Sequence, residues 1–312
     1  MMGYGRGGRM RIEKDRAKIL SGIRKNRTTG GPISILIKNK DFTIDKLASL
    51  TKARPGHADL AGALKFGEKD IRNILERASA RETAMRVAVG ALTKILLSEF
   101  GISALSSVTS IGKVDVTAKN GSLIKAEIDK ARKSGDTLGG ISEIVIKDVP
   151  VGLGSLSQWD RRLDGNLARC LMSIPAVKGV SIGGGFDLAG RKGSEVHDVI
   201  LYNKARGFHR KTNNAGGLEG GITNGEDIIL RIAMKPISTL GKPLDSIDIK
   251  TKKKIKAQVE RADVCAVQAC GIVCEAVSAI EIANAMIEKF GGDSLIEMKR
   301  NYKGYIEQVR RF

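Results

Sequence analysis

The stretch "SARETAMRVAVGALTKILL" at residues 79–97 contains the strongest helix signal in the chain. Ser79 and Glu82 have the spacing of a capping box, in which both side chains satisfy backbone N–H groups at a helix start. Apolar residues then recur at the spacing of one helical face, which we expect to be buried: Ala84, Val87, Ala88, Ala91, Leu92, Ile95 and Leu96. The stretch predicts an amphipathic helix that begins at Ser79.

On both sides of this helix, strand-like and helix-like segments alternate. We expect strands in "PISILIKNKD" (32–41), "SEIVIKDVPVGL" (142–153), "GVSIGGGF" (179–186) and "DIILRIAMKP" (227–236). Further helices are predicted over 160–172 and 266–290, the second ending at the pair Gly291 and Gly292. The pattern predicts a mixed α/β (α+β) fold, and because no Pro/Ser-rich linker interrupts it, we expect residues 1–312 to form a single domain.

Two segments resemble each other, "GGPISILIK" at residue 30 and "GGISEIVIK" at residue 139. Each is a glycine turn followed by a strand, which hints at a duplicated αβ architecture. The lysine-rich segment "KTKKKIKAQ" from Lys250 is interpreted as a solvated surface turn rather than a binding motif.

The composition narrows the possible partners. A formal net charge of +19 over 312 residues favours a polyanionic partner, which could be nucleic acid, an acidic membrane or a phosphorylated small molecule. Only 4% of residues are aromatic, which argues against single-strand binding through stacked bases. We find neither an apolar run long enough to span a bilayer nor a signal peptide, and therefore expect a cytoplasmic protein without a membrane partner.

The four cysteines do not have the spacing of a zinc site. Cys170 stands alone, and Cys265 precedes Cys270 and Cys274 in the apolar run "ADVCAVQACGIVCEAVSAI". Cys270 and Cys274 share one helical face, where we expect small core side chains. No metal is predicted.

Chemistry-bearing residues gather in "RPGHAD" at 54–59. This Pro-Gly turn holds Arg54, His57 and Asp59 within a few residues, a set able to bind an anion and to move a proton near neutral pH. Arg77 and Arg81 flank the predicted helix start at Ser79, where free N–H groups favour a phosphate. The alternative is an ordinary cap with Arg81 paired to Glu82 or Glu76.

The region "RPGHADLAGALKFGEKDIRNILERASARETAMRVAVGA" resembles the signature region of the chorismate synthase family. The resemblance continues through "GDTLGG", "VPVGLGS", "SIPAVKGVSIGGGF", "KTNNAGGLEGGITNGEDIILRIAMKPIST" and "GKPLDSIDI", nearly from end to end. It implies a carbon-oxygen lyase of the shikimate pathway, which serves aromatic amino acid biosynthesis.

The reaction implied is removal of phosphate and a ring hydrogen from 5-enolpyruvylshikimate 3-phosphate, which gives chorismate. The resemblance further implies reduced FMN as a cofactor without net redox change, NADPH as a possible reductant, a sandwich of helices and sheets with internal pseudo-symmetry, and a homotetramer. Substrate and flavin together carry two phosphates and two carboxylates, which fits the basic composition.

The resemblance also implies roles for individual residues. His57 would manage protonation beside the flavin, and Asp263 would help to remove the ring proton. Arg54 and Arg81 would bind anionic groups of the substrate. Flavin contacts are expected at Arg77, Ala78, Ser79, Ala176, Gly220, Lys235, Pro236, Ile237, Ser238, Thr239 and Arg261.

The opening segment "MMGYGRGGRM" is first open to interpretation as a nucleic-acid arm or as one wall of a ligand site. In the family, its first arginine, Arg6 here, helps to bind anionic substrate or NADP, with Arg9 nearby. The resemblance therefore favours the interpretation of this segment as one wall of a ligand site.

Departures from the family pattern concern both single residues and a whole segment. Pro175 stands where the family commonly has asparagine, Ala262 replaces serine or histidine, and Val264 replaces proline. The family's first strand, its "GESHG" loop with a histidine acid and the following helix have no counterpart, because His197 and His209 lie in unrelated contexts that we interpret as surface.

We favour a gene start upstream over a genuinely shortened protein. Two function classes stay open beside the lyase: a non-catalytic FMN-binding paralogue and, more remotely, a basic nucleic-acid-binding protein.

Overall fold

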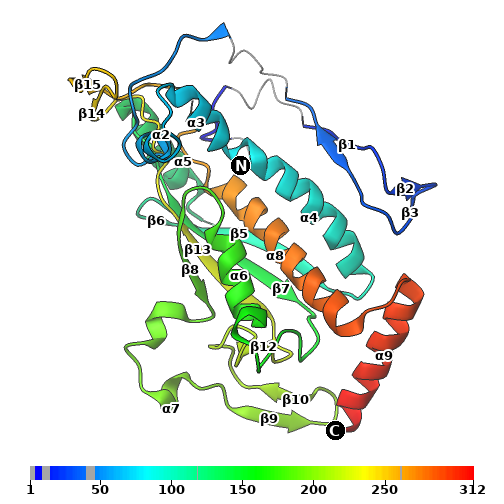
Figure 1. The fold of residues 1–312 in the computed structure, drawn as a ribbon. Coiled ribbons are helices and arrows are strands. Elements are labelled where there is room, and N and C mark those ends of the chain that lie inside the picture. Colours follow the sequence, from blue (N-terminus) through cyan, green and yellow to red (C-terminus); the bar gives the residue numbers. More distant parts are fainter. Residues whose placement is uncertain (1–3, 9–14, 40–45, 118, 261) are drawn as a thin grey trace.

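A five-stranded antiparallel sheet with the order β6-β5-β7-β13-β8 forms the centre of the molecule (Figure 1). The computed structural model describes residues 4–8, 15–39, 46–117, 119–260 and 262–312. The sheet consists of β5 (Ser103–Ile111), β6 (Val114–Asp115), β7 (Gly140–Lys147), β8 (Val177–Ile182) and β13 (Ile228–Met234). The strands predicted at 142–153, 179–186 and 227–236 correspond to β7, β8 and β13, although β7 and β8 end earlier than predicted, at Lys147 and Ile182. The mixed α+β class is confirmed.

Two helices cover one face of this sheet, and a third packs along one of them. The covering helices are α6 (Leu163–Met172) and α8 (Val267–Phe290), and α4 (Thr83–Ser98) packs along α8 (Figure 1). The predicted helices over 160–172 and 266–290 are thus confirmed, the first with a separate 3-10 turn at Trp159–Arg161. Helix α9 (Leu295–Arg311) follows α8 after the glycine pair.

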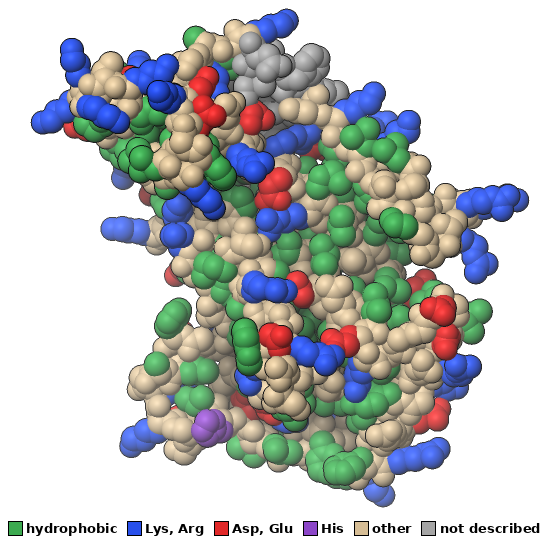
Figure 2. Space-filling model, in the orientation of Figure 1, with side chains coloured by type: hydrophobic (Ala, Val, Ile, Leu, Met, Phe, Trp, Pro, Cys, Tyr) green, Lys and Arg blue, Asp and Glu red, His purple; other side chains and the backbone are tan. Residues whose placement is uncertain are grey.

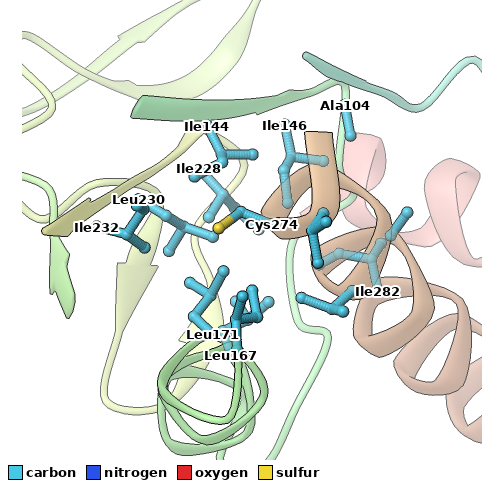
Figure 3. Close-up of a cluster of buried hydrophobic side chains, with 14 of the residues drawn as sticks. Ala104, Ile144, Ile146, Leu167, Leu171, Ile228, Leu230, Ile232, Cys274 and Ile282 are labelled. Atoms are coloured by element: carbon cyan, nitrogen blue, oxygen red, sulfur yellow. The ribbon is translucent and has the colours of Figure 1, made fainter. Parts of the chain in front are cut away.

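The main core lies between the sheet and these helices. Alternate residues of β7 and β13, among them Ile144, Leu230 and Ile232, point toward Leu167 and Leu171 of α6 (Figure 3). Each of these side chains is at most 1% exposed, and burying one contributes about 1.5–3 kcal/mol. This core fixes the strand ends from which the loops of the candidate site emerge.

Helix α8 corrects one expectation from the sequence. We found no segment apolar enough to cross a membrane, yet α8 has the length and composition to do so. Its apolar character is explained by its place in the core, where 67% of its most apolar window is buried. Cys270 and Cys274 lie in this helix as buried free thiols, as predicted, with their Sγ atoms 4.0 Å apart.

Helix α4 differs from prediction at its start and in its buried face. A 3-10 turn (Ala80–Glu82) precedes it, and Ser79 Oγ accepts from Arg81 N at 3.3 Å while the Glu82 carboxylate pairs with Arg86. The predicted capping box therefore does not form.

The buried face of α4 agrees with the prediction only in part, since Val87 and Leu96 pack against the core as expected. It is centred on Gly90 and Leu97, whereas Ile95 is 63% exposed. A Cβ on Gly90 would lie 2.4 Å from Ala276 Cβ, so the missing side chain sets the closest approach of α4 to α8. Apolar spacing alone overlooks glycine as a contact residue.

Smaller elements surround this body. The short helices are α2 (Asp59–Phe66), α3 (Ile71–Arg77), α5 (Gly121–Ser134), α7 (Gly193–Val196) and the 3-10 turn Gly185–Leu188. Two-stranded ladders join β1 (Ala17–Ile19) to β4 (Ile35–Ile37), β2 (Ile23–Arg24) to β3 (Arg27–Thr28), β9 (Ile200–Asn203) to β10 (Gly207–Arg210), β11 (Leu218–Glu219) to β12 (Ile222–Thr223) and β14 (Asp245–Ile247) to β15 (Lys254–Lys256).

Two of these ladders bear on the sequence predictions. The strand expected in 32–41 is β4, in an outlying ladder, whereas the similar segment from residue 139 forms β7 in the middle of the sheet. The lysine-rich segment forms the exposed turn and strand of β14–β15, as predicted. Lys and Arg side chains spread over the visible face and gather near this hairpin at the upper left (Figure 2).

Candidate active site

Three loops meet at one end of the central sheet. Met234, the last residue of β13, pairs with Gly140, the first of β7, and with Val177, the first of β8. The loop after β13 (235–239) therefore lies beside the loops that lead into β7 and β8. Lys235 N donates to Ala176 O at 2.9 Å, and Thr137 Oγ1 donates to Ile237 O at 2.6 Å.

Gly139 shows how closely these loops approach one another. A Cβ at this position would lie 2.2 Å from Met234 O, so no other residue fits without moving the backbone. The segment "GDTLGG" was part of the family resemblance but received no role from the sequence. Its structural role is to let the loop after β13 pack closely against the loop before β7, through Gly139 and Thr137.

The segment "RPGHAD" (residues 54–59), called the histidine turn from here on, leads into α2 and is organised around Asp59. This carboxylate accepts Arg54 N at 3.0 Å, Arg54 Nε at 2.8 Å and Arg54 Nη2 at 3.0 Å, and its Oδ1 lies 2.6 Å from His57 Nδ1. The side chains of Asp59 and Arg54 are 0% and 6% exposed, whereas that of His57 is 21% exposed. The turn buries a paired charge and leaves the imidazole accessible.

Two hydrogen bonds fasten this turn to the loop after β13. Arg54 Nη1 donates to Thr239 Oγ1 at 2.8 Å, and Lys235 Nζ donates to Gly56 O at 2.9 Å. Segments about 180 residues apart in the sequence, "RPGHAD" and "KPIST", thus form one surface.

Electrostatics at this surface favour an anionic ligand. Burial lowers the pKa of Lys235, and the nearby ammonium of Lys178 lowers it further. A negatively charged ligand beside Lys235 would stabilise the protonated ammonium and oppose both effects. Burial alone would raise the pKa of Asp59, but hydrogen bonds from His57 and Arg54 outweigh it and hold that pKa well below its ordinary value. Asp59 is therefore ionised at neutral pH.

The N-terminal segment docks on the segment before α8. Gly5 O accepts Val264 N at 2.7 Å, Gly7 N donates to Asp263 Oδ1 at 2.6 Å, and Arg6 Nε lies 2.7 Å from Asp263 Oδ2. Val264 O in turn accepts Leu138 N at 2.8 Å, which ties this pair to the loop before β7. Arg6 and Asp263 are thus brought together, whereas Arg9 and Arg261 lie outside the described residues.

The residues around Ser79 reach the same end of the sheet through α4. Arg86 Nη1 donates to Ser173 Oγ at 2.8 Å, which places the first turns of α4 against the loop that leads to Ala176. Arg81 pairs with Asp15 at 2.7 Å, a carboxylate different from the two considered in the sequence. Arg77 is directed to the ring of Phe66, 5.7 Å from its centroid.

Two expected contact residues have distinctive backbone conformations. Ala176 has a φ of 69°, a left-handed value that is uncommon for a residue with a side chain and directly follows the unusual Pro175. Gly220 has a φ of 61° and lies in the turn between β11 and β12, near the end of the molecule opposite β14–β15 (Figure 1). Within one chain, Gly220 is not brought to the surface formed by the other predicted residues.

Sequence reasoning missed several residues that build this surface. Thr137, Gly139 and Lys178 received no role, although all three lie in the quoted motifs "GDTLGG" and "SIPAVKGVSIGGGF". Arg54 was expected to bind substrate, but its donors are directed to Asp59 and Thr239, a pairing that only the fold reveals. Among the described residues, no group of three His, Cys, Asp or Glu side chains is placed to hold a metal ion.

A flavin phosphate fits the chemistry of this surface. Lys235 supplies an ammonium group, Ser238 and Thr239 supply hydroxyls, and Gly56 leaves room beside them, because a Cβ there would only come within 3.5 Å of Ser238 Cβ. The donor set is cationic and hydroxylic, as a phosphate ester requires.

Known proteins match this chain closely. The Chorismate synthase family matches residues 1–287. Relatives named chorismate synthase come from Geobacter sulfurreducens, at 52% identity over 99% of this chain and 89% of the relative, and from Caldanaerobacter subterraneus subsp. tengcongensis, at 56% identity over 99% and 88%. A solved structure titled "Crystal Structure of Chorismate Synthase" superposes with a TM-score of 0.82 at 41% identity, over 97% of this chain and 88% of that one. With the fold, the motifs and these relatives in agreement, the chain belongs to the chorismate synthase family.

Proposed function

We propose that this chain catalyses the elimination of phosphate from 5-enolpyruvylshikimate 3-phosphate to give chorismate, with reduced FMN as its cofactor. The observation that carries the proposal is the junction of the histidine turn with the loop after β13, through Arg54–Thr239 and Lys235–Gly56. This junction joins a proton-transfer group to a cationic anchor for phosphate. Members of the family are lyases of the shikimate pathway, and the proposal specifies how this chain would serve that chemistry.

The reaction breaks one C–O bond and one C–H bond of the substrate and forms a C=C bond, so phosphate and a proton must both leave. Lys235, Ser238 and Thr239 would hold the flavin phosphate through charge-assisted and hydroxyl hydrogen bonds. His57 would hold or supply a proton at Nε2. Reduced FMN, when bound, supplies electron density to the substrate transiently and recovers it, without net redox change.

Arg6 and Asp263 would act as a pair that responds to substrate. Their ion pair at 2.7 Å engages the carboxylate that the family resemblance assigns to proton removal. A substrate carboxylate or phosphate would compete for Arg6 and leave Asp263 as a stronger proton acceptor. Arg81 would add positive charge at the start of α4, while Arg77, Ala78, Ser79 and Ala176 would contact the flavin.

Further proposals rest on the family alone. A homotetramer would be the natural assembly, and it offers a way for Gly220 of one copy to approach a ligand bound by another. Arg9 and Arg261 would add to anion binding, NADPH would serve as a reductant where the flavin is reduced in place, and the protein would act in the cytoplasm. Light scattering after gel filtration tests the assembly.

The test of the proposed function is an anaerobic assay with photoreduced FMN and 5-enolpyruvylshikimate 3-phosphate. We expect phosphate and chorismate to appear in equal amounts, with no turnover on oxidised FMN. Binding of reduced FMN without phosphate release would contradict the enzymatic proposal and leave a flavin-binding role. Tight nucleic-acid binding that is indifferent to FMN would contradict both.

A further inference from the structure

We propose that Asp59 is a positioning residue for His57: it holds the imidazole with its proton on Nδ1 and leaves Nε2 as the nitrogen that exchanges a proton with the ligand. The inference rests on the proposed function for its kinetic consequence, but not for its structural content. Asp59 has no role in the family assignments made above.

The contact between the Asp59 carboxylate and the His57 imidazole places the ring proton on Nδ1. Asp59 Oδ1 lies 2.6 Å from His57 Nδ1, and Asp59 is fully buried. A buried carboxylate can only accept, so the hydrogen on this contact is on Nδ1. The hydrogen bond made by one ring nitrogen sets the tautomer of a neutral imidazole, which leaves a lone pair on Nε2.

Arg54 lies against the face of the His57 ring rather than in its plane. Arg54 Nη2 is 3.1 Å from Nδ1 and 3.4 Å from Nε2 of His57. An atom nearly equidistant from the two nitrogens would collide with Cε1 if it lay in the ring plane, so the guanidinium lies over the ring face. The in-plane lone pair of Nε2 is therefore not used by Arg54, and it has no other hydrogen-bond partner in the described part of the chain.

Asp59 is held in place and cannot turn away from His57. Its other contacts are three N–H groups of Arg54, and Arg54 is itself fixed by Thr239. The charged groups in contact with the imidazole are Arg54 and Asp59, both from its own turn. Lys235 of the loop after β13 contacts the same turn, where its ammonium donates to Gly56 O. Both loops thus fix the ring orientation before any ligand arrives.

If Asp59 had only a structural role, its substitution would leave the tautomer of His57 unchanged. Asp59 also begins α2, where a carboxylate stabilises the helix through its dipole. Asp70 offers a matched control, because it caps α3, accepts from Leu50 N at 2.9 Å and from Arg72 N at 3.0 Å, and is not among the hydrogen-bond partners of His57 in the described part of the chain. Both Asp→Asn variants remove a structural carboxylate, but only one of them touches the histidine.

The experiment is ¹⁵N NMR of the histidine rings in the full chain without ligand, at a pH where the rings are neutral. The chain has three histidines, so His197→Gln and His209→Gln assign the spectrum. We expect the Nδ1-protonated tautomer for His57 in the unsubstituted protein and in Asp70→Asn. In Asp59→Asn the Nε2-protonated form should appear, and Asp59→Glu should restore the original form in part.

The kinetic counterpart compares the same variants. Because proton transfer by a positioned group contributes about 10²- to 10⁴-fold, Asp59→Asn should lower kcat by at least about 10²-fold while KM changes much less. An Nε2-protonated His57 in the unsubstituted protein would overturn the proposal without any variant needing to fold. An unchanged tautomer in folded Asp59→Asn would overturn it too. Absence of turnover in the unsubstituted protein would refute the proposed function instead, since the tautomer is measured without substrate.

Discussion

Arg54 shows at the scale of one residue why the histidine turn needs a guanidinium. Its planar fork binds Asp59 through Nε and Nη2 and Thr239 through Nη1, and only a rigid group with several donors can do so at once. A lysine would provide the charge without this geometry. The types of residue at this site are visible in the sequence, but which donor meets which acceptor depends on a partner 185 positions away.

The paired charge of Asp59 predicts an acid-dependent stability difference. Asp59→Asn should destabilise the fold by about 3 kcal/mol at pH 7, because it leaves Arg54 buried without its counter-ion. The pKa of Asp59 is lower in the folded than in the unfolded chain, so its stabilisation is complete above about pH 4 and is lost as the pH falls below that value. Urea unfolding from pH 7 to pH 3 should show the two proteins converging, and a constant difference would contradict this origin.

Lys235 predicts a pH-dependent anion affinity. Lys235→Met should weaken binding of FMN by about 10- to 150-fold, since a charge-assisted hydrogen bond contributes about 1.5–3 kcal/mol. The unsubstituted protein should lose affinity as the pH rises through the pKa of Lys235, which burial and Lys178 lower, and thus below the pH at which an ordinary lysine titrates. Fluorescence titration measures both effects. Lys204→Met, on an exposed turn, should change neither.

At the scale of elements, the contact between α4 and α8 depends on a missing side chain. Gly90 faces Ala276, and any Cβ at residue 90 would overlap it. The sequence predicted that α4 exists and is amphipathic, since apolar spacing is a local property. It predicted Val87 and Leu96 as core contacts but not Gly90 as the centre of the buried face, because close approach at glycine depends on the shape of the partner helix.

Substitution of this glycine has a matched control within the chain. Gly90→Ala should destabilise the fold by about 1–3 kcal/mol, because overpacking outweighs the gain in helix propensity. Gly304→Ala in α9 meets no atom within 4 Å and should be neutral or stabilising by up to about 1 kcal/mol. Thermal unfolding separates them, and equal effects would show that helix propensity alone governs both sites.

At the scale of the whole molecule, antiparallel register brings the site together. Two strand starts and one strand end coincide at Gly140, Val177 and Met234, so three loops from distant parts of the chain share one edge. Each strand could be predicted from its own period-two pattern, whereas strand order and register depend on contacts between segments. The family resemblance supplied the role of each loop, and the fold supplies their junction.

The net charge of +19 predicts how the whole molecule attracts its substrate. The value of kcat/KM for the polyanionic substrate should fall several-fold between roughly 0.05 and 0.5 M salt, with kcat nearly constant, because screening weakens long-range attraction and leaves contacts inside the site largely intact. Steady-state rates at several ionic strengths measure this. A salt-independent kcat/KM would show that the surface charge serves another partner.

The most direct test of the account is single-turnover phosphate release from 5-enolpyruvylshikimate 3-phosphate with reduced FMN, compared between the unsubstituted protein and His57→Ala. His197→Ala, at an exposed position, is the control. The account predicts a loss of about 10²- to 10⁴-fold in His57→Ala and less than about twofold in His197→Ala. Full phosphate release by a folded His57→Ala protein would contradict the claim that the junction of the histidine turn with the loop after β13 is the active site.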